Sequence, residues 1–111
     1  MKPIYNDFLA VARSIVEAKY DSESFGCPEF CKAIKMSRSA VHRKLIAALN
    51  LSTSEFIQEI RLQKAMELLL NTNQSVYEIA FRVGYSDPNY FSRSFSKVYG
   101  MPPSQCRQVS A

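Results

Sequence analysis

Five basic side chains, with no acidic one among them, lie between Phe30 and Asn50. They are Lys32, Lys35, Arg38, Arg43 and Lys44. A run of one sign of charge is most often a solvated face. Here, however, it falls on a predicted helical hairpin, where it suits a polyanion such as a nucleic acid backbone. The whole chain is only modestly basic, with a formal net charge of +4 and a pI of about 9.1.

The other chemistry-bearing residues form no catalytic or metal-binding pattern. Cys27 and Cys31 are four residues apart and could share a metal, but the chain has a single histidine, His42, and its third cysteine, Cys106, is isolated. Small buried side chains are the better interpretation, and an odd cysteine count favours a reducing cytosol, hence a cytoplasmic location. No paired carboxylates, phosphate-cradling loop or catalytic triad is visible, so we expect no metal, no cofactor and no enzymatic activity.

Composition and length predict an all-α fold. The chain has 111 residues, of which 47% are hydrophobic and 22% charged, and only three glycines. This suits one domain or two small lobes. No basic-then-apolar leader opens the chain and no apolar run approaches the roughly 20 residues that a membrane span needs, so we expect no membrane contact.

Caps and hydrophobic periodicity predict seven helices. The first begins at a cap on Asn6 or Asp7 and runs to about Lys19, and a polar loop from Asp21 to Gly26 follows it. Five further helices are predicted. Pro28 marks the first turn of one that reaches Lys35, Ser37 caps one at 38–49, and Asp87 with Pro88 begins one at 88–99. Capping boxes begin the other two: Ser52 and Glu55 a helix to about Leu70, and Ser75 and Glu78 a helix that ends at Val83 and Gly84. A short last helix follows Pro103.

A degenerate repeat relates the second and third predicted helices to the fifth and sixth. The segments Glu29–Phe30–Cys31 and Met36–Ser37 recur 49 residues later as Glu78–Ile79–Ala80 and Tyr85–Ser86. After one inserted residue, the next matches are 50 residues apart, and they pair Val41, Arg43 and Leu45 with Phe91, Arg93 and Phe95. Each copy is a short helix, a tight turn and a longer helix, which is the plan of a helix-turn-helix unit.

The longer helix of each copy has a computable outward face. We expect the inward residues to be Val41, Leu45, Ala48 and Leu49 in the first copy and Phe91, Phe95, Val98 and Tyr99 in the second. The opposite faces present Ser39 and Arg43 flanked by Ala40 and His42, and Asn89 and Arg93 flanked by Tyr90 and Ser92, with Lys97 a turn later. Arginine can bond guanine and asparagine can bond adenine in a bidentate manner.

The long fourth helix predicts how the two units work together. About 19 residues span roughly 28 Å, against about 34 Å for one turn of B-DNA. We expect recognition helices at 38–49 and 88–99 to enter successive major grooves. The predicted organisation is an N-terminal lobe at 1–51 with a helix-turn-helix at about 27–49, a linker helix at 52–71, and a C-terminal lobe at 72–111 with a helix-turn-helix at about 75–99.

Many spaced positions resemble the AraC/XylS family of transcription regulators, over about Asp7 to Arg107. The residues that carry the resemblance are Met36–Ser37–Arg38–Ser39, Arg61–Leu62, Ala65, Leu68–Leu69, Ser75–Val76–Tyr77–Glu78–Ile79–Ala80, Val83–Gly84–Tyr85, Tyr90–Phe91–Ser92–Arg93, Phe95, Gly100 and Pro103. Three segments are further similar to output domains of hybrid two-component sensors: Met36–Ser37–Arg38–Ser39, Arg43–Lys44–Leu45 and Ser54–Glu55–Phe56–Ile57.

The resemblance implies seven helices in two homeodomain-like lobes, with double-stranded DNA and RNA polymerase as partners and an effector or receiver domain in a parent protein. It places base-facing side chains at Ser39, Ala40, His42, Arg43, Pro88, Asn89, Tyr90 and Arg93. Arg38, Lys44, Ser92 and Lys97 are expected to contact phosphates, and Arg61 to be a structural residue of the linker helix.

The chain departs from the family pattern at several positions. Lys35 and Asn50 stand where the family often has glycine, Cys106 stands where an aromatic residue is usual, and Ser39 and Ala40 are small. A helical protein-interaction module without DNA binding is the alternative interpretation, and the basic residues Arg43 and Arg93 favour DNA over it.

Overall fold

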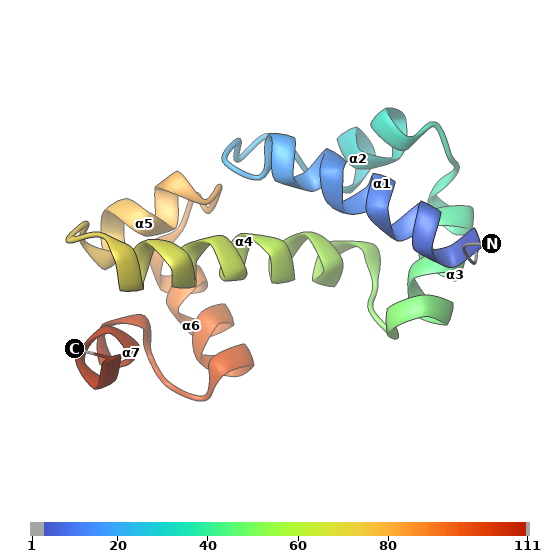
Figure 1. The fold of residues 1–111 in the computed structure, drawn as a ribbon. Helices are drawn as coiled ribbons and strands as arrows, with labels where there is room; N and C mark the ends of the chain where they lie inside the picture. The colour runs from blue at the N-terminus through green and yellow to red at the C-terminus, as the bar shows by residue number, and fades with distance from the viewer. Residues whose placement is uncertain (1–3, 111) are drawn as a thin grey trace. The chain divides into compact units, whose positions relative to one another are not determined.

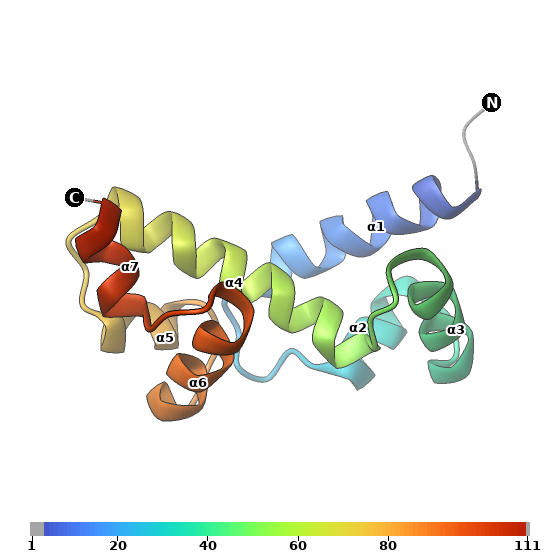
Figure 2. The same cartoon turned by 90° about the horizontal axis from the view of Figure 1, so that it is seen from below.

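The computed structural model describes residues 4–110. Over that range the chain forms seven α-helices and no strand, as the sequence predicted. The helices are α1 Ile4–Lys19, α2 Cys27–Ile34, α3 Arg38–Leu49, α4 Thr53–Asn71, α5 Val76–Arg82, α6 Pro88–Tyr99 and α7 Pro103–Ser110 (Figures 1 and 2). They form two compact units, residues 4–20 with 24–60 and residues 21–23 with 61–110, and the boundary falls inside α4.

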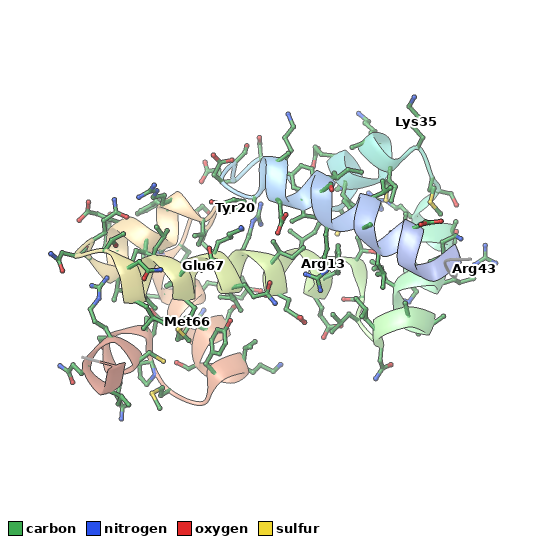
Figure 3. All side chains as sticks on the ribbon, viewed as in Figure 1. Arg13, Tyr20, Lys35, Arg43, Met66 and Glu67 are labelled. Carbon is green, nitrogen blue, oxygen red and sulfur yellow. The ribbon has the colours of Figure 1, made fainter. Side chains whose placement is uncertain are left out.

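In the first unit, α1 packs on α2 and α2 packs on α3. The fully buried Phe30 of α2 is central, because its ring meets Phe25 at 6.4 Å and Phe56 at 6.1 Å between centroids. Two cations also cover rings of this unit. The Arg13 guanidinium (Arg13 is labelled in Figure 3) lies 6.0 Å from the Phe56 centroid. The Lys44 ammonium lies 5.5 Å from the centroid of the Phe8 ring.

The second unit is built around a chain of aromatic rings. Phe91 and Phe95 of α6 are fully buried. Centroid distances are 5.3 Å from Tyr85 to Phe91, 5.9 Å from Phe91 to Phe95 and 4.6 Å from Phe95 to Tyr99, in edge-on or tilted geometry. Such ring pairs add about 0.5–1.5 kcal/mol each beyond the area they bury. Two of these pairs lie within α6 and stabilise the helix, and the Tyr85 pair joins α6 to the turn before it.

Most predicted helix starts are confirmed by their hydrogen bonds. The Ser37 hydroxyl accepts from the Ala40 N–H at 3.2 Å. Both capping boxes form, with the Ser52 and Ser75 backbone N–H groups donating to the carboxylates of Glu55 and Glu78 at 2.9 and 3.3 Å. These contacts satisfy donors that the first helical turn leaves unpaired.

The start and the outer face of α1 were predicted wrongly. The helix already begins at Ile4, so neither Asn6 nor Asp7 caps it. Asp7 lies in the first turn instead, where its carboxylate interacts favourably with the helix dipole. Helical periodicity predicts an apolar stripe of Phe8, Val11, Ala12, Ile15 and Val16 on this helix. Val11 is nevertheless 51% exposed, because it lies at the edge of that stripe.

Two further expectations about burial were wrong. Val98 was expected to face the core but is 55% exposed, since it lies in the last turn of α6, two residues before Gly100 closes the helix. Phe25, inside the segment expected to be a polar loop, is only 5% exposed and packs on Phe30.

The repeat is confirmed in the backbone. The Met36 N–H donates to the Cys31 carbonyl at 3.2 Å, and the equivalent Tyr85 N–H donates to Ala80 at 3.0 Å. These are the bonds of a Schellman helix end. The residue before each donor has positive φ, 59° at Lys35 and 95° at Gly84, so α2 ends at Ile34 and Lys35 is its cap.

The ends of the recognition helices match in the same way. Asn50 closes α3 with φ 56° and donates to the Ile46 carbonyl at 2.9 Å. Gly100 closes α6 with φ 80° and donates to the Ser96 carbonyl at 2.8 Å. The two units therefore share one backbone plan, although their side chains differ.

Candidate nucleic-acid interface

The outward face of α3 is set by two buried anchors. Val41 and Leu45 are fully buried, and this fixes the rotation of the helix about its axis. Ser39, His42 and Arg43 are consequently exposed, and Ala40 is partly buried. The side chain of Arg43 extends beyond the ribbon in Figure 3.

The outward face of α6 is set by the equivalent anchors, Phe91 and Phe95. At its start Asp87 caps the helix, because its Oδ1 accepts from the Asn89 N–H at 2.9 Å. Asn89 and Arg93 are exposed and Tyr90 is 44% exposed. Pro88 fills the first turn and is partly buried.

The two arginines occupy equivalent positions in the two units. Arg43 follows the buried Val41 by two residues, and Arg93 follows the buried Phe91 by two. Both are exposed, and among residues 4–110 neither forms a hydrogen bond or ion pair. The N–H donors of both guanidinium groups are therefore available to a ligand outside the chain. Their planar arrangement suits a ligand with two adjacent hydrogen-bond acceptors.

The side chains expected to contact phosphates differ in their surroundings. Arg38 and Lys97 are exposed, while Ser92 is partly buried. Lys44 is also partly buried, with its ammonium over the Phe8 ring. The four lie on or beside the outward faces of α3 and α6, and their phosphate contacts remain predictions.

A buried tyrosine supports the start of α6, and sequence reasoning gave it no such role. The Tyr85 ring lies 6.0 Å from that of Tyr90. Its hydroxyl is buried without a hydrogen bond of good geometry. Burial raises the pKa of Tyr85 to about 12, and the nearby Arg61 guanidinium partly offsets that rise. The only sequence signal is its place in the repeat, opposite Met36.

Two more arginines act inside the second unit. Arg61 of α4 donates to the Ser22 carbonyl at 3.0 Å, and burial lowers the pKa of its guanidinium. Arg107 of α7 donates to the carbonyls of Leu69 and Thr72 at 3.0 and 3.1 Å. These carbonyls lie at the end of α4, where a cation is favourable and where no glycine closes the helix.

The three cysteines are small side chains in or beside the hydrophobic core. Cys31 and Cys106 are buried and Cys27 is partly buried, and all three are free thiols. Burial is the main cause that raises the pKa of Cys27, and the neighbouring Cys31 thiol raises it further. Residues 4–110 contain no group of three potential metal-ligating side chains. None of the described helices is both long and apolar enough to cross a membrane.

These features define a class of protein, a DNA-binding domain with two helix-turn-helix units. A family model described as "Helix-turn-helix domain" matches residues 30–108. The C-terminal domain of AraT, a response regulator from Geobacillus stearothermophilus, has a similar structure, with a TM-score of 0.82 and 30% identity over 97% of this chain and 86% of that one.

Two relatives extend the similarity to longer proteins. The transcriptional activator RhaR of Mannheimia succiniciproducens is 38% identical over 86 residues, which are 78% of this chain and 31% of RhaR. Histidine kinase P4 of Formosa agariphila is 36% identical over 102 residues, which are 92% of this chain but 7% of the kinase. The chain belongs to the AraC/XylS family and is a sequence-specific DNA-binding domain for transcription regulation. The family that it matches is a DNA-binding family and not a catalytic one.

Proposed function

We propose that this domain reads an asymmetric site of about two helical turns on double-stranded DNA, with α3 and α6 in successive major grooves. The observation that carries the proposal is the equivalent placement of Arg43 and Arg93. Each lies at the centre of an exposed face opposite fully buried anchors, and neither has a partner among residues 4–110.

The base-reading chemistry follows from the outward side chains. Arg43 and Arg93 are suited to guanine O6 and N7, and Asn89 to adenine N6 and N7. Tyr90 can contact a thymine methyl group. Ser39, Ala40, His42 and Pro88 complete the two base-facing sets.

Phosphate contacts would set the register of each unit on the duplex. We assign them to Arg38 and Lys44 beside α3, and to Ser92 and Lys97 on α6. The Lys44 ammonium lies over the Phe8 ring, and it would move away from that ring to contact a phosphate.

The spacing of the two half-sites follows from the length of α4. Its 19 residues extend about 28 Å, slightly less than the roughly 34 Å of one turn of B-DNA. One chain would therefore read two boxes about 10 base pairs apart without dimerising.

The domain would act within a larger regulator in the cytoplasm. Because the chain spans only 7% and 31% of the two relatives, an effector or receiver domain elsewhere in a parent protein would supply the signal. RNA polymerase is the proposed partner at the promoter. We assign this segment itself no catalytic step.

Selection of bound duplexes from a random 30-base-pair pool tests the proposal, followed by titration of the winner at several salt concentrations. Two enriched boxes about 10 base pairs apart, with affinity that falls as salt rises, are the expected result. Absence of binding at low salt would contradict the proposal and favour an interaction module. The exposed ring pair of Tyr77 and Phe81 on α5, 5.0 Å apart, would then be the first contact surface to test.

A further inference from the structure

We propose that the two recognition helices divide their work, with α6 supplying most of the base discrimination and α3 mostly non-specific affinity through charge. This inference rests on the proposed function, because it assigns roles within the same DNA interface. It comes from comparing the equivalent positions of the two units, where the backbone is the same and the side chains are not.

The base-facing positions differ most in the first helical turn. Position for position, Ser39 corresponds to Asn89 and Ala40 to Tyr90, whereas arginine is common to both helices. An asparagine amide offers a donor and an acceptor that match adenine together, while a serine hydroxyl bonds either kind of group and discriminates less. Alanine offers a methyl group only, so the first turn of α3 has fewer means of telling base pairs apart than that of α6.

The discriminating side chains of α6 are also better supported. Both helices have a capped first turn, since Asp87 accepts from the Asn89 N–H and Ser37 from the Ala40 N–H. The difference lies in the aromatic rings of the second unit. The Tyr90 ring is backed by Tyr85, which is only 5% exposed and lies 5.3 Å from Phe91. In the turn before α3 the position of Tyr85 is taken by Met36, a flexible side chain that gives no rigid platform. Side chains held in place lose less freedom on binding, which favours geometric readout.

Charge shows the opposite asymmetry. The stretch from Phe30 to Asn50 carries five basic and no acidic side chains, a net charge of +5. The equivalent stretch from Ile79 to Gly100 carries three basic residues (Arg82, Arg93 and Lys97) and the acidic Asp87, which gives 3 − 1 = +2. Contacts to phosphates depend on charge and are independent of sequence, so the first unit is the stronger anchor.

Lys35 shows the same asymmetry at a single position. It has φ 59°, in a turn where the second unit has Gly84. A left-handed conformation is unfavourable for lysine, but the residue adds a cation that projects outward from the ribbon (Figure 3). The first unit thus carries charge at a position where the backbone geometry favours glycine.

Selection from the random pool with the wild-type chain is the first test. One box should be restrictive and the other tolerant. Binding to the selected duplex and to duplexes with either box randomised is then measured for Asn89→Ser and for its counterpart Ser39→Ala. Asn89→Ser should lower the ratio of cognate to randomised affinity about tenfold with no change in salt slope. Ser39→Ala should change that ratio less than about twofold.

A second variant, Asn89→Ser with Tyr90→Ala, gives these two positions of α6 the side chains that α3 has at Ser39 and Ala40. It should remove most of the remaining preference. Circular dichroism melting checks that the double variant folds. If it does not fold, the single variant Asn89→Ser at an exposed position still tests the proposal. Two equally restrictive boxes, or a loss for Ser39→Ala as large as for Asn89→Ser, would overturn the division of work and leave the proposed function standing. A pool with no enriched sequence would contradict the proposed function and, with it, this inference.

Discussion

Replacing Lys35 with glycine should stabilise the domain. Lys35 has φ 59° and ψ 43°, a left-handed conformation that costs an L-residue about 1–2 kcal/mol. Glycine avoids that cost but loses more backbone freedom on folding, about 0.5–1 kcal/mol. The difference predicts that Lys35→Gly raises the free energy of unfolding by about 0.5–1 kcal/mol, or the Tm by a few degrees.

Urea denaturation followed by circular dichroism measures this difference, and two variants separate its causes. Lys35→Ala removes the same charge but keeps the left-handed strain, so it should not stabilise the domain. Gly84→Ala introduces the strain at the equivalent turn, where φ is 95°, and should destabilise the domain by about 1 kcal/mol or more. If Lys35→Ala stabilised as much as Lys35→Gly, the gain would come from relief of charge repulsion and the backbone argument would be refuted.

Three further predictions concern the second unit and the DNA contact. Arg107→Ala should destabilise the domain by about 1–3 kcal/mol in urea unfolding, since it leaves the carbonyls of Leu69 and Thr72 without a charged donor, and an unchanged midpoint would remove the role assigned to it. Burial raises the pKa of Tyr85 to about 12, above the value near 10 of an unfolded tyrosine, so the stability that it contributes is complete below pH 10 and is lost as the pH rises towards 12. Tyr85→Phe should therefore flatten the decline of Tm over that range, and an equally steep decline in the variant would show that other groups cause it. Lys44→Ala should weaken binding on all duplexes and reduce the salt slope by about 0.9, and an unchanged slope would place Lys44 outside the interface.

The helix ends could be predicted because their signals are local. Ser37 and Ser75 cap the helices that they precede by bonding backbone N–H groups three residues ahead. The same holds for Asp87, which bonds two residues ahead. Asn6 and Asp7 carry the same chemistry but lie within α1, since capping residues also occur inside first turns and the sequence does not distinguish the two cases.

The sequence predicted which side of a helix faces the core, but not how deeply each residue is buried. Helical periodicity correctly pointed Val41, Leu45, Phe91 and Phe95 inward, but it could not tell whether another helix covers a given turn. Val98 has the same direction as Phe91 but lies in the last turn of α6 and is exposed. Phe25 lies outside any helix, so no period could indicate that it packs on Phe30.

The supporting contacts of the candidate interface needed tertiary information. Tyr85 backs Tyr90 from five residues away, across the turn of the second unit. Arg107 reaches carbonyls more than 30 residues earlier in the chain. Neither contact produces a periodic pattern in the sequence from which it could be predicted. The outward positions of Arg43 and Arg93, in contrast, followed from the repeat and the helical period together.

The central claim is that Arg93 reads a base from the major groove. It is tested most directly by measuring the affinity of wild type and Arg93→Ala for the selected duplex and for a random duplex at one salt concentration. Loss of about 1–3 kcal/mol on the selected duplex, little loss on the random one and relaxed preference at a single base pair are the predicted results. An equal loss on both duplexes would make Arg93 a phosphate contact and contradict the account.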